Sequence, residues 1–174
     1  NKESNLGFER FICIHAIMLS LEGVPALYIH SLFGTKNDYE LFDKTGQNRS
    51  LNRGKIRYKD IDLLDKTKNQ TKVFNKLKTL SNIRKRQRAF HPNAVQFTLH
   101  LGKNLYGVWR QSLDKKQSIF CISNLTDKDV GLSLLDLNLI GFDEWQDLIS
   151  QKKFNDVTMK LTLAPYQTVW LTNL

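Results

Sequence analysis

Cysteine is scarce in this sequence, and long apolar segments are absent from it. The two cysteines, Cys13 and Cys121, lie far apart and form no C-x-x-C pair, so their spacing indicates neither a disulfide framework nor a redox motif. We expect reduced thiols in the core of a cytoplasmic protein. The apolar run of residues 11–21 includes His15 and is about half as long as a membrane-spanning helix. It predicts a buried helix and no membrane partner.

Three other kinds of signal are missing. No basic leader precedes an apolar segment and a small-residue cleavage site, so we expect no secretory signal in these residues. The four histidines, His15, His30, His91 and His100, lack the spacing of metal ligands, and we expect no metal ion and no other cofactor. No repeat or low-complexity tract is present, which favours a globular protein.

The composition favours a packed core and a partner that carries negative charge. Hydrophobic residues make up 41% of the 174 residues, and the net charge is +9. A basic surface concentrates polyanions, which leaves nucleic acid, an anionic membrane surface and a phosphate-bearing substrate as candidates. The densest basic run, IRKRQR at residues 83–88, falls at a predicted helix C-terminus, where cations complement the helix dipole. No aromatic residues interleave with it to stack bases, so we expect a solvated helix end and no nucleic-acid partner.

The chain begins with a predicted helix followed by a predicted strand. Residues 6–21 are apolar on nearly all sides, which predicts a helix that is covered on most of its surface. Residues 24–29 form a short apolar run rich in β-branched and aromatic side chains, entered through Gly23 and Pro25. Such a run is typical of a parallel strand that is buried on both faces.

A long connection and a second helix follow. Residues 71–88 carry apolar side chains at spacings of three and four and predict an amphipathic helix that ends before Pro92. Residues 30–54 show no sustained period, and connections of such length are uncommon unless they are functional or disordered. We interpret them as an ordered binding loop at the carboxyl end of a barrel strand, where such sites lie. Residues 1–90 are thus expected to form the end of a (β/α)₈ barrel.

After Pro92 the apolar residues alternate instead. The pattern predicts seven short strands, at residues 95–101, 105–111, 118–123, 130–134, 144–149, 159–163 and 168–171. Short strands at this spacing, separated by polar turns, indicate an antiparallel sandwich or barrel. The expected fold class is therefore α/β plus all-β, with a β-sandwich domain at residues 91–174.

Within the loop, Arg49 and Arg53 are the strongest candidates for a binding role. The guanidinium group offers a planar set of donors that matches phosphate or carboxylate. The alternative is a structural salt bridge within the loop, to one of three acidic residues, Asp38, Glu40 and Asp43. Charged loop residues are usually solvated or paired, so both interpretations stay open.

Three more loop residues could contact a sugar. Asn37 and Asp38 could hydrogen-bond hydroxyl groups, and His30 could point into the site from the strand end, although a single histidine there is more often structural. Asp38 and Glu40 lie only two positions apart, whereas catalytic carboxylates in glycoside chemistry need a separation of roughly 5–9.5 Å across the bond. We expect turn formation and arginine pairing from these two acids and assign no catalytic residue.

The segment GVPALYIHSLFGTKNDYELFDKTGQNRSLNR at residues 23–53 resembles the last barrel strand and following loop of the sucrose phosphorylase subfamily of the α-amylase family, glycoside hydrolase family 13. Those members show a G-[IV]-P-x-x-Y run, an N-D-x-E-L segment and a K-T…R-x-[IL]-N-R segment. The closing LAPYQTVWL resembles that family's last strand. The resemblance implies a retaining enzyme that transfers a glucosyl group from a small α-glucoside, such as sucrose or glucosylglycerate, to phosphate, and it favours Arg53 as a phosphate ligand.

The catalytic carboxylates of that family lie on earlier barrel strands. The chain is therefore expected to be the C-terminal portion of the enzyme, inactive alone and partnered by an N-terminal barrel. A strand at residues 24–29 without neighbouring strands would expose its edges. We accordingly expect residues 1–90 to be marginally stable, with either self-association through residues 1–54 or a disordered loop at residues 30–53, whereas the β domain folds independently.

Two other functions stay open. The nearest is a hydrolase or transglucosidase of the same superfamily, which the acceptor, phosphate or water, would distinguish. The other is a carbohydrate-binding module, which needs a row of exposed aromatic side chains on one sheet face. Trp109, Trp145 and Trp170 lie in the β part, where packing in the core is the commoner fate of tryptophan.

Overall fold

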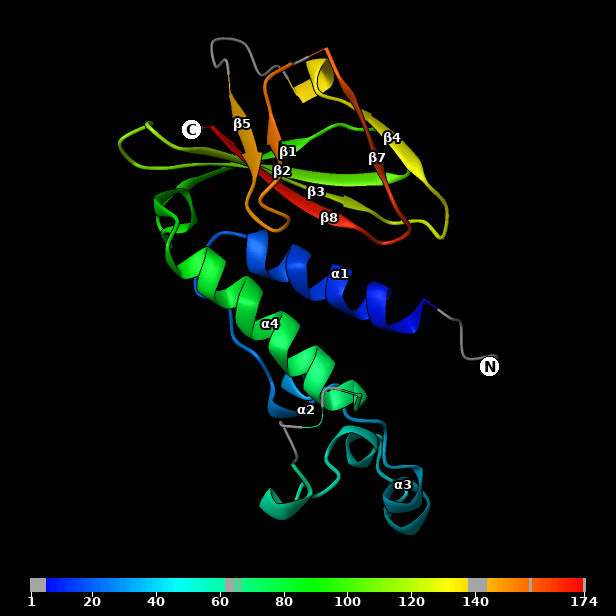
Figure 1. Cartoon of the computed structure of the whole chain (residues 1–174). Coiled ribbons are helices and arrows are strands. Elements are labelled where there is room, and N and C mark those ends of the chain that lie inside the picture. The colour runs from blue at the N-terminus through cyan, green and yellow to red at the C-terminus, as the bar shows by residue number, and fades with distance from the viewer. Residues whose placement is uncertain (1–5, 62–64, 66, 138–143, 157, 174) are drawn as a thin grey trace. The chain divides into compact units, whose positions relative to one another are not determined.

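The computed structural model describes residues 6–61, 65, 67–137, 144–156 and 158–173. By their contacts the residues form two compact units (Figure 1). The sandwich unit consists of Asn1–Pro25 with Thr79–Leu174, and the loop unit consists of Ala26–Lys78. The expected domain boundary near residue 91 stays a prediction. No helix within the described residues combines the length and the apolar character that crossing a membrane requires.

Two antiparallel sheets make up most of the sandwich unit. The larger has the strand order β1-β2-β3-β8-β5-β6 and the smaller pairs β4 with β7. Their bounds are β1 Val95–Leu99, β2 Leu105–Gln111, β3 Ser118–Asn124, β4 Val130–Ser133, β5 Trp145–Asp147, β6 Lys153–Phe154, β7 Lys160–Leu163 and β8 Thr168–Asn173. All seven predicted strands are confirmed. The two-residue β6 was not predicted, because it is too short for its alternation to be recognised.

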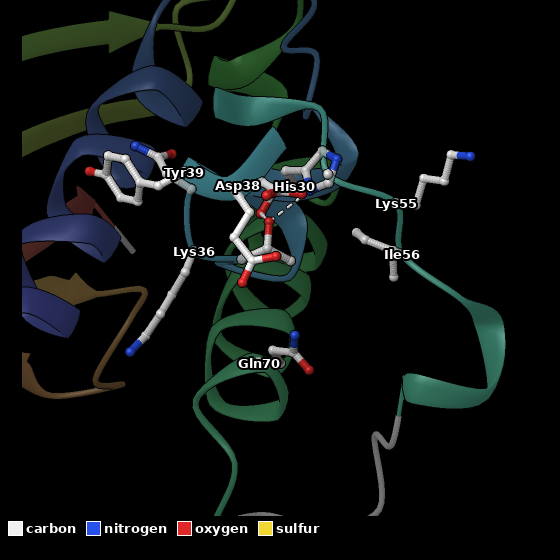
Figure 2. A pocket seen from close by; sticks show the side chains of 11 residues that line it. His30, Lys36, Asp38, Tyr39, Lys55, Ile56 and Gln70 are labelled. Carbon is white, nitrogen blue, oxygen red and sulfur yellow. Dashed lines mark hydrogen bonds between the residues drawn. The ribbon is translucent and has the colours of Figure 1, made fainter. Parts of the chain in front are cut away.

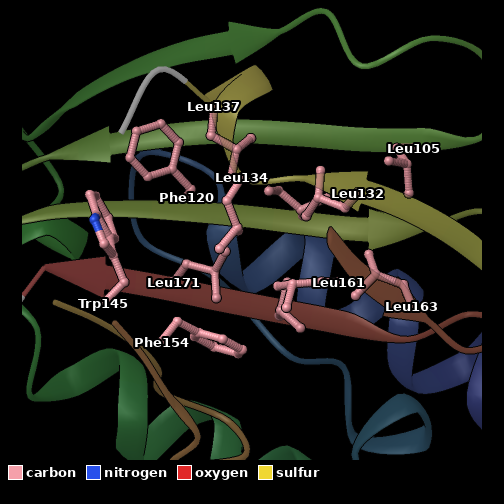
Figure 3. Close-up of a cluster of buried hydrophobic side chains, with 12 residues drawn as sticks. Leu105, Phe120, Leu132, Leu134, Leu137, Trp145, Phe154, Leu161, Leu163 and Leu171 are labelled. Atoms are coloured by element: carbon pink, nitrogen blue, oxygen red, sulfur yellow. The ribbon is translucent and has the colours of Figure 1, made fainter. Parts of the chain in front are cut away.

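One apolar core lies between the two sheets. It is built from side chains of both, namely Leu105, Phe120, Ile122, Leu132, Leu134, Leu137, Trp145, Phe154, Leu161, Leu163, Val169 and Leu171. Figure 3 shows them converging from the strands and from the short helix η4 (Leu135–Leu137). Successive strand residues point to opposite faces, so Ile119 and Cys121, both buried, lie on the other face of the larger sheet.

Helix α1 (Gly7–Ser20) covers that other face. It contacts β3 and β8, and the sulfur of Cys13 lies 3.7 Å from the carbonyl oxygen of Asn124. Trp170 of β8 is fully buried and packs edge-on against Phe90 of η3 (Arg88–Phe90), with ring centroids 5.0 Å apart. The sequence predicted a helix that is covered on most of its surface. The structure differs at Ile14, which is 59% exposed. The sandwich unit therefore has three layers, with α1 as the third (Figure 1).

Both cysteines are free and buried, as expected. Burial raises the pKa of the Cys13 thiol and, more strongly, that of the Cys121 thiol, because a low dielectric disfavours the thiolate. Neither thiol is therefore activated as a nucleophile.

Two arginines hold the C-terminal end of α1, and one of them belongs to the basic run that was expected to be solvated. In the basic run at the end of helix α4 (Asn69–Lys85), Lys85, Arg86 and Arg88 are exposed as expected, whereas Arg84 is only 7% exposed. Its guanidinium donates to the carbonyl oxygens of Leu19 and, at 2.9 Å, of Gly23. Arg110 of β2, fully buried, donates to the carbonyl oxygen of Ser20 at 3.1 Å. These bonds satisfy carbonyls that a helix end leaves without partners.

The predicted strand at residues 24–29 is wrong for this structure. Residues 24–28 form no strand, and Ile29 begins the short helix α2 (Ile29–Leu32). Val24 is 81% exposed, and Tyr28 and Ile29 are each 49% exposed. A strand exists only when neighbouring strands share its backbone hydrogen bonds, and none of the described strands pairs with this segment.

The connection that follows is ordered into short helices. After α2 come α3 (Tyr39–Thr45), η1 (Asn48–Asn52) and η2 (Tyr58–Asp60). The predicted loop therefore has helical structure that its lack of a sustained period did not indicate.

Candidate functional site

A pocket of about 530 Å³ lies within the loop unit (Figure 2). Three stretches of chain form its walls: the segment from α2 into α3, the segment after η1, and the first turn of α4. The lining residues are His30, Thr35, Lys36, Asn37, Asp38, Tyr39, Glu40, Gly54, Lys55, Ile56 and Gln70. The pocket therefore brings together three of the five predicted site residues, His30, Asn37 and Asp38.

Asp38 shapes one wall of the pocket as a helix cap. Its Oδ1 accepts a hydrogen bond from the backbone N–H of Leu41 at 2.9 Å, which satisfies one of the free N–H groups at the start of α3. Its own backbone N–H donates to the carbonyl oxygen of Leu51 at 2.7 Å. A Cβ on Gly54 would lie 3.0 Å from Asp38 Oδ2, so the second wall approaches the first because residue 54 lacks a side chain. The expected turn-forming role of Asp38 is confirmed.

His30 is held in place by a neighbouring hydroxyl group. Its Nδ1 lies 2.7 Å from Thr35 Oγ1, and the backbone N–H of Thr35 donates to the carbonyl oxygen of His30 at 3.0 Å. The imidazole also lies 5.2 Å, centroid to centroid, from the Tyr28 ring. One ring nitrogen is thus occupied within the protein, and the other has no hydrogen-bond partner among the described residues.

Arg49 and Arg53 do not line the pocket. Both side chains are exposed. Arg49 Nε donates a hydrogen bond to Gln47 Oε1 at 2.7 Å. The backbone N–H of Arg53 donates to the carbonyl oxygen of Ser50 at the end of η1. Within the described part of the chain, neither guanidinium forms an ion pair with an acidic loop residue. The salt-bridge alternative therefore finds no support, and the binding role of both arginines stays a prediction.

Sequence reasoning missed several lining residues. Lys55 and Ile56 lie immediately beyond the predicted loop, and Gln70 comes from the first turn of α4. The position of Lys55 beside Arg53 was a usable signal, whereas the approach of α4 depends on tertiary structure. The described residues contain no group of three or more His, Cys, Asp or Glu side chains that could hold a metal ion.

The tryptophans do not form an exposed row. Trp145 and Trp170 are 1% and 0% exposed. Trp109 is half-buried and stacks on Phe120, with centroids 5.7 Å apart and planes inclined by 8°. The prediction that these residues pack in the core is confirmed for Trp145 and Trp170, so the three tryptophans do not provide the exposed row that a carbohydrate-binding module would need.

Comparison with known proteins gives related sequences of greater length. The glucosylglycerate phosphorylase of Escherichia coli is 33% identical over 166 residues, which cover 93% of this chain and 28% of that protein. The enzymes of the same name from Allomeiothermus silvanus and Spirochaeta thermophila are 32% and 28% identical, over 98% and 94% of this chain. The chain spans 28–30% of the length of these relatives. No family model matches it.

Solved structures share its fold. AmyP in complex with maltose superposes with a TM-score of 0.75 at 14% identity, over 99% of this chain and 36% of that one. The trehalose-6-phosphate hydrolase of Bacillus licheniformis has a TM-score of 0.66 at 17% identity, over 99% and 40% of the two chains. At such identities the likeness concerns the fold alone. These neighbours confirm the expected fold class, α/β plus all-β.

Proposed function

Because this chain is homologous to one part of the glucosylglycerate phosphorylases and shares the fold of one part of α-amylase-family enzymes, we propose that it is the C-terminal portion of a retaining α-glucoside phosphorylase. The whole enzyme would transfer a glucosyl group from glucosylglycerate, sucrose or a similar small α-glucoside to phosphate. The observation that carries the proposal is similarity to three phosphorylases over 93–98% of the chain.

The chemistry of the whole enzyme would proceed in two steps. One carboxylate attacks the anomeric carbon while a second protonates the leaving oxygen, and phosphate then displaces the enzyme carboxylate to give glucose 1-phosphate. Both carboxylates would come from the rest of the enzyme. This chain would contribute the acceptor side through the pocket around His30, Asn37 and Asp38.

We propose oxyanion binding for the two loop arginines. Both guanidinium groups are exposed, and an exposed guanidinium with no acidic partner among the described residues can pair with a phosphate through two parallel hydrogen bonds. Arg53 is favoured because it directly precedes Gly54 and Lys55 in the pocket wall.

We infer the binding partners of this chain from the exposed segment that precedes the loop. Residues 24–29 carry apolar side chains that water contacts, with Val24 81% exposed. Exposed apolar patches mark interaction surfaces, which supports docking against an N-terminal barrel or, without one, against a second copy of the chain. A cytoplasmic location is proposed from the two free thiols.

A hydrolase or transglucosidase is the second candidate, because a trehalose-6-phosphate hydrolase is among the fold neighbours. The test uses the complete gene product that contains these residues, incubated with glucosylglycerate or sucrose in the presence and absence of phosphate. We expect glucose 1-phosphate to form only with phosphate. Release of free glucose at the same rate under both conditions would overturn the proposal in favour of hydrolysis.

A further inference from the structure

We propose that the outer edge of β1 pairs with the same edge of a second copy of this protein, in an antiparallel register centred on Phe97. A two-fold axis through that point would join the larger sheets of the two copies into one continuous sheet. The surface belongs to the sandwich unit and is separate from the exposed segment at residues 24–29. The inference does not depend on the proposed enzymatic function.

The outer side of β1 carries no strand in the described part of the chain. β1 is the last strand at one side of the larger sheet. Apart from its ladder with β2, the described residues form no backbone–backbone hydrogen bond with Gln96 or Thr98. The backbone N–H of Glu22 donates at 2.8 Å to Oε1 of Gln96, which occupies that side chain and not its backbone. Such an edge is a template on which a further strand can pair.

The edge also lacks the charges that usually protect an edge strand from pairing. Residues 89–102 contain no Lys, Arg, Asp or Glu, although these four types make up 25% of the whole chain. Because the net charge is +9, two copies repel each other over most of their surface and approach at least cost where charge is absent. A strand rich in charge of either sign would find no complement here, whereas the neutral β1 of a second copy fits.

The pattern of the sheet determines which backbone groups of β1 point outward. Directly after β2 the N–H of Ser112 donates to the carbonyl oxygen of Gln117, and directly before it the carbonyl oxygen of Asn104 accepts from the N–H of Leu125. Even-numbered residues of β2 therefore face β3. Because the residues of an antiparallel strand bond alternately to its two neighbours, the odd-numbered residues of β2 face β1, where their partners are also odd-numbered. The backbone groups of the even-numbered residues of β1 thus point away from the sheet.

Self-pairing through these outward groups has a register that also matches the side chains. With Phe97 on the two-fold axis, Gln96 of each copy lies opposite Thr98 of the other, and the backbones of each such pair can exchange hydrogen bonds. Phe97 then faces its own counterpart in a non-hydrogen-bonded pair, where the Cα atoms are about 4.5 Å apart and the side chains are closest. Val95 lies opposite Leu99. The three apolar residues of β1 therefore meet their equivalents on one face of the joined sheet.

The side chains at the centre of this register are partly exposed in the single chain. Val95 is 44% and Phe97 is 45% exposed. The ring of Phe97 packs against Trp109, with centroids 4.9 Å apart, and Trp109 stacks on the core residue Phe120. A second Phe97 ring would extend this aromatic row across the interface, and cross-strand aromatic pairs stabilise a sheet.

The size of the contact determines how strong the dimer can be. β1 has five residues, and a strand pair of that length buries less surface than the roughly 1,200 Å² at the lower end of stable interfaces. We therefore expect a weak dimer that forms in a concentration-dependent manner, with a dissociation constant in the micromolar range.

The experiment measures the oligomeric state of the complete gene product by sedimentation velocity over a series of concentrations. Phe97→Lys and Phe97→Glu should each raise the dissociation constant of the dimer at least tenfold, because the two-fold axis sets like charges directly opposite each other. An equimolar mixture of the two variants should dimerise again, since Lys then faces Glu. The matched control is Leu113→Lys, which adds the same charge at a side chain that is 62% exposed between β2 and β3 and should leave the dimer unchanged.

A second variant tests the backbone pairing without changing Phe97. Thr98→Pro removes an N–H that points away from β2, and proline is tolerated at such positions of an edge strand. We expect the same tenfold weakening of the dimer, with the urea midpoint of the protein unchanged.

Three results would overturn the inference. The first is a wild type that stays monomeric at hundreds of micromolar, in which case no second copy occupies this edge. The second is a dimer that neither Phe97→Lys nor Thr98→Pro weakens, which would place the interface elsewhere. The third is the absence of a mixed dimer from the Phe97→Lys and Phe97→Glu variants, which would refute the register.

Discussion

The sandwich unit and the loop unit bury their side chains to different extents. The sandwich unit closes an apolar core between two sheets and adds α1 on the outer face. In the loop unit the buried apolar side chains among the described residues are Phe33, Val73 and Leu77. Tyr58, in contrast, is 92% exposed. Burial of apolar surface is the main source of stability, so we expect the sandwich unit to be the more stable of the two.

The two units also differ in what holds their backbone. In the sandwich unit the strands share long ladders, such as the seven residue pairs between β2 and β3. The loop unit relies on single local bonds, for example the Asp38 cap of α3. Regions with few buried contacts open at low free energy, and binding loops are drawn from such regions.

The largest expected difference is in resistance to protease. Trypsin should cut the 174-residue chain first after Lys55, Arg57 or Lys59, which are all exposed in the loop unit. The two products should stay together on gel filtration, because α1 remains packed on the sheet, and separate in denaturant. Mass spectrometry identifies the sites. First cleavage after Lys115, in the exposed turn between β2 and β3, would show that the sandwich opens first.

Removal of the buried cation should destabilise the sandwich unit. Arg84→Met leaves the carbonyls of Leu19 and Gly23 without their donors, and we expect a loss of about 2–3 kcal/mol in the free energy of unfolding. Burial and the nearby Arg110 lower the pKa of Arg84, which reduces the net effect. Urea unfolding measures this change in the free energy of unfolding. Arg86→Met, on the exposed side of the same helix end, should change the value by less than about 0.5 kcal/mol.

Loss of a helix cap should affect only the loop unit. Asp38→Ala removes the acceptor for the N–H of Leu41, at an expected local cost of about 1 kcal/mol. Hydrogen exchange should become faster at the first turn of α3, while the urea midpoint of the sandwich unit stays unchanged. Asp38→Ser keeps a capping oxygen and should keep the protection. A lower midpoint for the whole chain would show that the two units unfold together.

The smallest expected effect concerns one turn of the sandwich unit at low pH. Hydrogen bonds from Ser112 Oγ and from the backbone N–H of Lys116 lower the pKa of Asp114 from its ordinary value of 3.8. A lowered pKa stabilises the fold above that ordinary value, and the contribution is lost as the pH falls through the folded pKa. The melting temperature of the wild type should therefore decline slightly more below about pH 4 than that of Asp114→Asn. Asp129→Asn, at an exposed site, is the control; parallel curves for all three would refute the effect.

The strands were predictable because one buried face imposes alternation on each of them. The observed β2, Leu105–Gln111, has the predicted bounds. The resemblance to α-glucoside phosphorylases was also predictable, since the residues that carry it are local, and the relatives confirm it.

What could not be predicted depends on tertiary structure. The burial of Arg84 and Arg110 requires α1, β2 and the end of α4 to meet, and no local pattern records that meeting. The apolar run at residues 24–29 does favour a strand, but pairing needs partners that none of the described strands provides. In the pocket, Asp38 was recognisable as a turn former, whereas Gln70 joins from 32 positions further along the chain.

The two arginines at the end of α1 also bear on when this helix can dock while the chain is being synthesised. Arg84 reaches a carbonyl 65 positions earlier in the chain, and Arg110 reaches one 90 positions earlier. At a synthesis rate of about 5–20 residues per second, α1 leaves the ribosome roughly 3–13 s before its first cationic partner. During that interval its apolar face has no sheet to pack on, because β3 and β8 are translated later still. Docking of α1 on this sheet is therefore a late step of folding.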